Sequence, residues 1–345
     1  MTERSDAPAV AAPQRAFFVR RVDAMNQFEL FLVSAVGTIL VVRSILAATG
    51  WPQLGGGKIH FAHLLWGGLG MLIAVILFLA LQGRLWRTLG TLAAGIGFGL
   101  FIDELGKFIT SDNDYFFQPA IAIIYVIFVG LFFLFRWLGN FSHLSSQTAL
   151  VNAFDYAKEA VLRDMDEGER TEALRLLARA DQTDPVVVSL GEMLRSATTV
   201  TGPTPYAHAK NWLAGFYAGL VRRRWFQRIV VGWFLFVAFV GILVVMVTVA
   251  ATPSLTFAQT GFSVSAAIAG VLVVIGIVRG RHSRLKRYRW FERAALVSIL
   301  VGEFFQFYAN QLGALAGLLI LLLTFITIRY MIGEEQRKLA EAGTA

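Results

Sequence analysis

The residues of this chain that could do chemistry are charged and polar side chains inside or beside long apolar stretches. A charge within a bilayer is costly, so such residues are functional candidates by default. One group comes early in the chain and the other near its end, each in the outer part of an expected membrane span. The sequence therefore predicts one polar pocket that opens outward, formed by Arg43, His60, His63, Asp103, Glu104, Lys107, Asp112, Glu303, Gln306 and Asn310.

These side chains suit several kinds of chemistry. His60 and His63, three apart on a helix, could join Glu104 as three ligands of a divalent metal with an open position. The same histidines and carboxylates could pass a proton. Two simpler roles stay open: Asp103 and Lys107, four apart, could form an ion pair, and the histidines could lie in headgroup water. No other cofactor is evident in the sequence.

Small residues indicate how these groups are oriented. Gly95 and Gly99 share a helix face with Asp103, because residues four apart lie above one another on a helix. Small residues at this spacing allow helices to approach closely. Gly67 stands in the same relation to His63. We therefore expect both polar groups to face a neighbouring helix rather than lipid.

The composition is that of a membrane protein. Of 345 residues, 56% are hydrophobic and 16% are charged, whereas soluble domains are about 45–50% apolar and about 25% charged. A membrane helix needs roughly 20 apolar residues. We therefore predict an all-α polytopic membrane protein with eight spans at about 28–48, 62–82, 88–109, 118–138, 229–251, 263–279, 293–310 and 312–332. The last two are nearly continuous, so a single kinked span, and seven in all, is the alternative.

The positions of lysine and arginine predict the orientation. The net charge is +8, and the basic residues gather in alternate connectors, among them 222–228 and 279–293, which the positive-inside rule places in the cytoplasm. Eight spans then put both termini in the cytoplasm. The basic connectors would contact anionic lipid headgroups, and Arg43 could extend to outer phosphates. Nucleic acid is disfavoured, because the basic residues are split among separate loops.

Changes in composition divide the chain into five parts. Residues 140–228 form the longest polar stretch, with nearly balanced charges and helical periodicity. Breaks at Asp184-Pro185 and Gly202-Pro203 indicate an insert of three or four helices. It could cap the membrane part, form a homodimer or dock a cytoplasmic partner. The predicted parts are a disordered cytoplasmic leader (1–16), a four-helix membrane unit (17–139), the cytoplasmic helical insert (140–228), a second four-helix unit (229–332) and a cytoplasmic tail (333–345).

The two membrane units resemble each other. Residues 40–42 and 243–245 both read Leu-Val-Val, 203 positions apart, and Glu104 corresponds to Glu303, 199 positions later. A four-helix unit returns the chain to its starting side, so the copies would be parallel repeats. Such repeats are related by an axis along the membrane normal, as in one class of transporter.

Residues 58–130 carry a family resemblance. A Lys…His-Phe sequence starts one span, an acidic pair lies near the outer end of the next, and an Asp…Asn loop follows. This pattern resembles VanZ-like and YjdF-like four-helix membrane units, and the stretch is similar to a family of multi-pass proteins from actinobacterial genomes. The resemblance implies a membrane protein of the bacterial envelope, near cell-wall or lipid chemistry, without an established reaction. The matching residues are Lys58, His60, Phe61, Asp103, Glu104, Asp112 and Asn113.

The absence of several sequence motifs narrows the classes of function that this chain could have. The chain has no cysteine, which excludes disulfides, thiolate metal sites and cysteine nucleophiles. It has no P-loop, so ATP-driven work by this chain is disfavoured, and it has no familiar hydrolase motif. The favoured interpretation is a non-enzymatic protein that handles a small solute, ion or proton through the outward pocket. The alternatives are an intramembrane or interfacial enzyme, metal-dependent or not, acting on lipid or envelope precursors, and a sensor or scaffold whose insert docks a partner.

Overall fold

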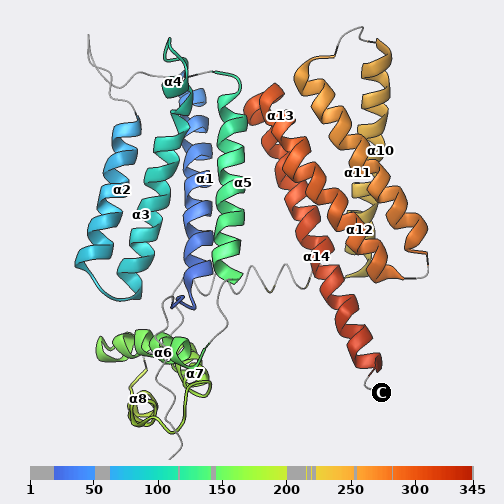
Figure 1. The fold of residues 1–345 in the computed structure, drawn as a ribbon. Helices are drawn as coiled ribbons and strands as arrows, with labels where there is room; N and C mark the ends of the chain where they lie inside the picture. The colour runs from blue at the N-terminus through green and yellow to red at the C-terminus, as the bar shows by residue number, and fades with distance from the viewer. Residues whose placement is uncertain are drawn as a thin grey trace, which may run out of the picture. The chain divides into compact units, whose positions relative to one another are not determined.

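In a computed structural model of the protein, the described residues are 19–50, 63–115, 117–140, 145–199, 215, 219, 223–251, 255–281 and 283–343. The leader predicted at 1–16 and His60 lie outside them. Every regular element in the described part is helical (Figure 1), as predicted. The long helices are α1 (Ala24–Thr49), α2 (His63–Ala80), α3 (Arg84–Asp103), α5 (Ala120–Asn140), α10 (Arg224–Ala251), α11 (Phe257–Arg279) and α14 (Leu315–Gly343).

Shorter helices complete the described chain. They are α4 (Leu105–Ile109), α6 (Ser146–Val161), α7 (Glu167–Leu177), α8 (Pro185–Ser196), α12 (Arg284–Val297) and α13 (Glu303–Asn310). A π-helical turn (Ser298–Gly302) joins α12 to α13, and a 3-10 turn (Gln311–Ala314) joins α13 to α14.

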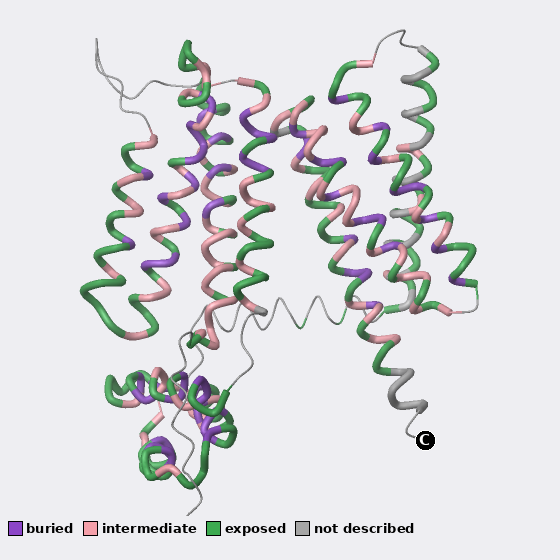
Figure 2. Tube along the Cα trace, in the orientation of Figure 1, coloured by how far each residue is buried: buried purple, intermediate pink, exposed green. Residues whose placement is uncertain are grey.

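Six of the described helices, α1, α2, α3, α5, α11 and α14, are long and apolar enough to cross a membrane. Their exposed faces are apolar: Val33, Leu79 and Leu323 are 70%, 83% and 56% exposed. Figure 2 shows exposed and intermediate residues along most of these helices, with few buried ones. Such extensive apolar surface is unfavourable in water and suits lipid. The helices therefore fit a multi-pass integral membrane protein.

The chain reverses direction between α13 and α14, at Gln311, whose φ is +42°. Ala295 of α12 and Ile328 of α14 belong to one buried cluster. On one straight helix these residues would lie roughly 50 Å apart, at about 1.5 Å per residue. The alternative of a single kinked span is therefore wrong here, and 293–310 and 312–332 belong to two antiparallel segments. The second also continues past its expected end at 332, to Gly343.

Contacts divide the chain into two compact units, one made of residues 1–35, 70–96 and 134–203 and the other of 36–69, 97–133 and 204–345. The first contains α6, α7 and α8, which pack around Met165, Leu176 and Leu194. Local sequence sets these helix starts. Asp166 caps α7, and Asp184 caps α8 ahead of Pro185, at the break predicted there.

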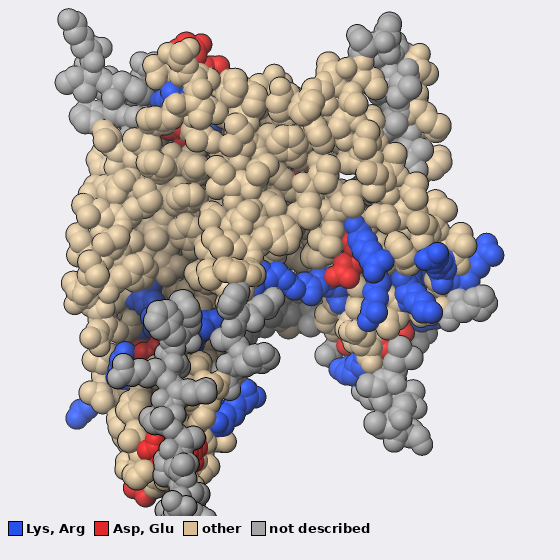
Figure 3. Space-filling view, in the orientation of Figure 1, with Lys and Arg blue, Asp and Glu red and all other residues tan. Residues whose placement is uncertain are grey.

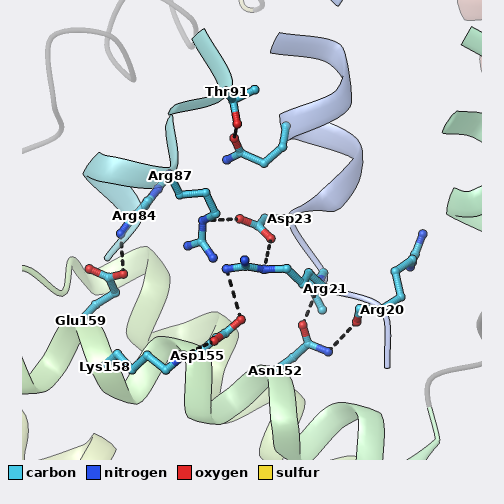
Figure 4. Close-up of polar contacts among 12 residues, drawn as sticks. Arg20, Arg21, Asp23, Arg84, Arg87, Thr91, Asn152, Asp155, Lys158 and Glu159 are labelled. Atoms are coloured by element: carbon cyan, nitrogen blue, oxygen red, sulfur yellow. Dashed lines mark hydrogen bonds and ion pairs between the residues drawn. The ribbon is translucent and has the colours of Figure 1, made fainter. Parts of the chain in front are cut away.

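Polar contacts within this unit tie α6 to the beginnings of α1 and α3 (Figure 4). The buried Asn152 side chain accepts from the Val22 N–H and donates to the Arg20 carbonyl, both at 2.8 Å. Glu159 accepts the backbone N–H of Arg84 at 2.8 Å. The three short helices are thus attached to membrane helices through side chains as well as through the chain itself. Further ion pairs join Arg21, Asp23, Arg87 and Asp155.

Candidate functional site

The first polar group forms where the helix through Asp103 is interrupted. Helix α3 ends at Asp103 and α4 begins at Leu105, with Glu104 between them at φ −87° and ψ 12°. Both carboxylates are buried, with 1% and 0% of the residue exposed. The interruption lets two adjacent acidic side chains reach different neighbours.

Asp103 is neutralised by Arg43 of α1. The Nε of Arg43 donates to Oδ1 of Asp103 at 2.5 Å, and its Nη2 donates to the Asp103 carbonyl at 3.2 Å. The Tyr115 hydroxyl donates to Oδ2 at 2.7 Å. Burial, and then the neighbouring Asp103 charge, raise the pKa of Tyr115, so this hydroxyl remains a donor. Both oxygens of the Asp103 carboxylate are therefore occupied.

Glu104 caps the N-terminus of α2. Its Oε1 accepts the backbone N–H of His63, the first residue of α2, at 2.6 Å, and lies 2.9 Å from the ring Nδ1. The first N–H groups of a helix have no partner within the helix, and a side-chain oxygen can cap them. The Nζ of Lys107 lies 3.5 Å from Oε2 of Glu104. We call Arg43, His63, Asp103, Glu104, Lys107 and Tyr115 the paired cluster.

Two expectations about this cluster are corrected. The structure pairs Asp103 with Arg43, not with Lys107 as expected, and Lys107 forms an ion pair with Glu104. The four-residue spacing fails because the helix is interrupted at Glu104. Arg43, for which contact with outer lipid phosphates was one of two possibilities, is 2% exposed and contacts Asp103 instead.

The close helix contact expected at Gly67 is confirmed. A Cβ atom at this position would lie 2.6 Å from the backbone nitrogen of Phe101 and 2.7 Å from the carbonyl oxygen of Gly97, both in α3. No side chain fits at such a distance, so glycine lets α2 and α3 touch through their backbones. This contact brings His63 within reach of Glu104.

The second polar group begins at another helix irregularity. Glu303 is the first residue after the π-helical turn Ser298–Gly302, and such turns are rare and are frequent at functional sites. Within the turn, the Ile299 carbonyl accepts a hydrogen bond from the Tyr125 hydroxyl of α5. The Tyr125 ring packs on Phe307, with ring centres 5.0 Å apart. Tyr125 thus holds the irregular turn in place.

A cavity of about 380 Å³ lies beside Glu303, between α10, α11, the π-helical turn, α13 and α14. Pockets that take small molecules are of this size or larger, from about 300 Å³ upward. We call it the Glu303 cavity. Its walls are mostly apolar or glycine, and its polar lining residues are Ser265, Ser298, Glu303, Gln306, Asn310 and Thr324.

Glu303 has no neutralising partner among the described residues. The residue is 5% exposed, and its Oε2 is buried without a hydrogen bond there. Gly317 leaves room for the carboxyl group, because a Cβ atom at that position would lie 3.3 Å from Oε1. The described lining contains no lysine, arginine or histidine. A buried carboxylate without a partner is costly, so this position favours an added proton or an added cation.

The residues predicted to form one pocket thus lie in two places. Arg43, His63, Asp103, Glu104 and Lys107 are in the paired cluster, whereas Glu303, Gln306 and Asn310 line the Glu303 cavity. One apolar cluster contains Ile102 and Leu105 beside the first and Phe304 and Phe307 beside the second. Apolar packing therefore replaces the continuous polar surface that the prediction requires. Asp112 is exposed in the loop after α4.

The predicted metal site stays a prediction. In the part of the chain that the structure describes, no three histidine or acidic side chains gather as metal ligands would. His63 and Glu104 contact each other directly. His60, the third expected ligand, lies outside that part.

A scan against protein-family models and searches of curated proteins and of solved structures found no match for this chain. The resemblance at residues 58–130 therefore stays a prediction. The function has to follow from the geometry of the chain's own side chains.

Sequence reasoning missed several residues of both sites. Tyr115 could have been found from the sequence, because it lies in the same polar loop as Asp112. Ser265 and Thr324 carried a weaker signal, as hydroxyl groups within apolar spans. Tyr125 carried none, because an aromatic residue in a span most often serves packing.

Proposed function

We propose that this integral membrane protein handles a small solute, an ion or a proton, and that Glu303 binds and releases it. The observation that carries the proposal is a buried carboxyl group beside a 380 Å³ cavity, with no neutralising partner among the described residues. An ionisable group in the membrane is a functional candidate by default. The paired cluster is the weaker candidate, because its carboxylates already have cationic partners.

The backbone around Glu303 supports this choice. In secondary transporters, substrates and coupling ions bind where membrane helices are interrupted. Here the π-helical turn lies directly before Glu303, and the chain reverses at Gln311, eight residues after it. Residues of both irregular turns line the cavity: Ser298 and Gly302 from the first, and Gly313 and Ala314 from the second.

We further propose the finer membrane topology: eight spans in two parallel halves, both termini and the insert in the cytoplasm, in a bacterial inner membrane. The support is the distribution of basic residues. Figure 3 shows a group of basic side chains at the lower side of the part that contains α12. The chain from the end of α11 through α12 carries seven basic residues: Arg279, Arg281, Arg284, Lys286, Arg287, Arg289 and Arg293. Because the chain has no cysteine, Lys158→Cys gives a single label site on α6. Labelling by an impermeant reagent in intact cells would contradict this topology.

The function itself can be tested in liposomes that hold the purified protein and a pH-sensitive dye. We expect the wild-type protein to dissipate an imposed pH gradient faster than protein-free liposomes do. Glu303→Gln should remove this activity, because an amide cannot carry the proton. The matched control is Glu292→Gln on α12, whose carboxylate pairs with Arg329 at 3.4 Å outside the cavity lining. Equal fluxes through the wild-type protein and Glu303→Gln would contradict the proposal.

A further inference from the structure

Two hydroxyl groups of the Glu303 cavity, those of Ser265 and Thr324, have already used their protons. Ser265 Oγ donates to the Phe262 carbonyl and Thr324 Oγ1 donates to the Ile320 carbonyl, both at 2.8 Å. A hydroxyl group has one donor and two acceptor positions. Each therefore presents only lone pairs to the cavity. Together with the carboxyl group of Glu303, these two hydroxyl groups offer acceptors to a ligand that donates hydrogen bonds, while the amides of Gln306 and Asn310 can donate or accept.

The charged groups around Glu303 also favour a ligand that brings its own positive charge. The described lining from α10, α11, α13 and α14 contains no other acidic or basic side chain. The titratable neighbour from α5 is Tyr125, whose hydroxyl is engaged by the Ile299 carbonyl. The basic side chains of the paired cluster are bound to their own carboxylates. A positive charge at Glu303 must therefore come from outside the described chain.

The walls of the cavity decide what kind of cation fits. Trp233, Phe262, Val273, Ile320 and Leu321 give it a largely hydrocarbon surface. A hard metal ion such as calcium takes about six to eight oxygen ligands, and hydrocarbon walls do not supply them. Aromatic side chains, in contrast, favour contact with organic cations. Apolar walls with one acidic group suit a molecule that has an apolar body and one positive charge.

We infer, on the basis of the proposed function, that the ligand of the Glu303 cavity is a monovalent organic cation, an ammonium group on an apolar body. Its binding is an exchange. The protonated carboxyl group of Glu303 gives its proton to water as the ammonium ion enters, which leaves a carboxylate–ammonium pair. No covalent bond of the ligand changes. The cavity stays neutral before and after the exchange, so neither state contains an uncompensated buried charge.

The inference is tested by titration calorimetry on the full-length protein in detergent with two probes of similar shape. 2-Phenylethylamine is a cation at neutral pH, and 2-phenylethanol is its neutral counterpart. We expect the amine to bind at least about tenfold more tightly than the alcohol, because hydrogen bonds to a charged group are the stronger kind. Buffers of different ionisation enthalpy should report release of about one proton per amine bound.

Two variants and one control sharpen this test. Glu303→Gln should reduce amine affinity to that of the alcohol and remove proton release. Gly317→Leu keeps the carboxyl group but fills the space beside it, so it should weaken binding of both probes. Glu292→Gln should bind both as the wild-type protein does. Thermal unfolding of each variant shows that it is folded.

The outcomes separate the ligand class from the function. Equal binding of amine and alcohol by the wild-type protein would overturn the inference, as would amine binding without proton release. If the wild-type protein binds no amine but still shows Glu303-dependent proton flux, the ligand class is wrong and the proposed function stands. If Glu303→Gln retains both amine binding and proton flux, both are wrong.

Discussion

The paired cluster and the Glu303 cavity both place buried carboxyl groups at helix interruptions, yet they balance charge in opposite ways. Asp103 and Glu104 are in contact with Arg43, Lys107 and hydrogen-bond donors. No described basic side chain reaches Glu303, which faces open volume instead. Burial alone therefore does not identify a functional acid. Open volume and the absence of a described basic partner distinguish Glu303 from Asp103 and Glu104, and they are the reason that we propose Glu303 as the binding residue.

The largest expected effect comes from removing one partner in the paired cluster. Asp103→Ala leaves the Arg43 guanidinium buried, with 3% of its side chain exposed. Breaking a buried pair from one side costs about 3–5 kcal/mol of stability. Thermal unfolding in detergent measures the loss.

The double variant Asp103→Ala with Arg43→Met is the control for this prediction. It removes both charges, so it should recover much of the loss seen in the single variant. Simple addition of the two single effects would show that Asp103 and Arg43 are not coupled. The paired cluster would then not be a structural site of the kind described.

The next largest effect is the difference in stability between matched amide substitutions at the two sites. Asp103→Asn removes a charge that Arg43 requires, so we expect it to cost about 1.5–3 kcal/mol, the range for hydrogen bonds to charged groups. Glu303→Gln replaces a buried carboxyl group that no described basic residue contacts with an amide of similar shape, which is neutral like the protonated acid, so stability should be unchanged or higher. Unfolding of both variants under one condition provides the comparison. A larger loss at Glu303 than at Asp103 would reverse our assignment of the two sites.

A smaller effect is expected where the backbone positions the paired cluster. A side chain at Gly67 would collide with the backbone of α3, and overpacking typically costs about 1–3 kcal/mol. Gly67→Leu should therefore destabilise the protein. Gly68→Leu is the matched control, because a Cβ atom there has no heavy atom within 4 Å. Equal unfolding temperatures for the two variants would mean that α2 and α3 do not touch at Gly67.

The smallest effect concerns an exposed ion pair in α7, which tests whether burial is what makes the paired cluster strong. Arg175 donates hydrogen bonds to Glu172, which lowers the pKa of that carboxyl group. A carboxyl group whose pKa is lower in the folded protein than in the unfolded chain stabilises the fold at pH values above its ordinary, unfolded-state pKa. This contribution is lost as the pH falls through the folded-state pKa. Glu172→Gln should lower the unfolding temperature slightly at pH 7 and not at pH 3. A loss as large as that of Asp103→Ala would contradict the role given to burial.

Much of the fold could be predicted from the sequence because its causes are local. Apolar runs of sufficient length predicted helices at six of the places where the structure has membrane-length ones. Asp184-Pro185 predicted a break between helices, and α8 begins there in the structure, because aspartate caps a helix and proline fits its first turn. The candidate acidic residues were found the same way, since a charge in an apolar run is visible without any tertiary structure. The internal repeat stays a prediction.

Only the tertiary structure decided what those acidic residues do. Arg43 and Asp103 are 60 positions apart, and Tyr125 and Ile299 are 174 positions apart, so no local pattern could pair them. The helix interruption at Glu104 gave Asp103 a different partner from the one that spacing predicted. The volume beside Glu303 depends on six elements packed together, the 3-10 turn included, with Gly317 leaving the space. Residue type determined where charges could matter, but contact between distant segments determined which acidic groups have a basic partner within the described chain and which acidic group faces open volume instead.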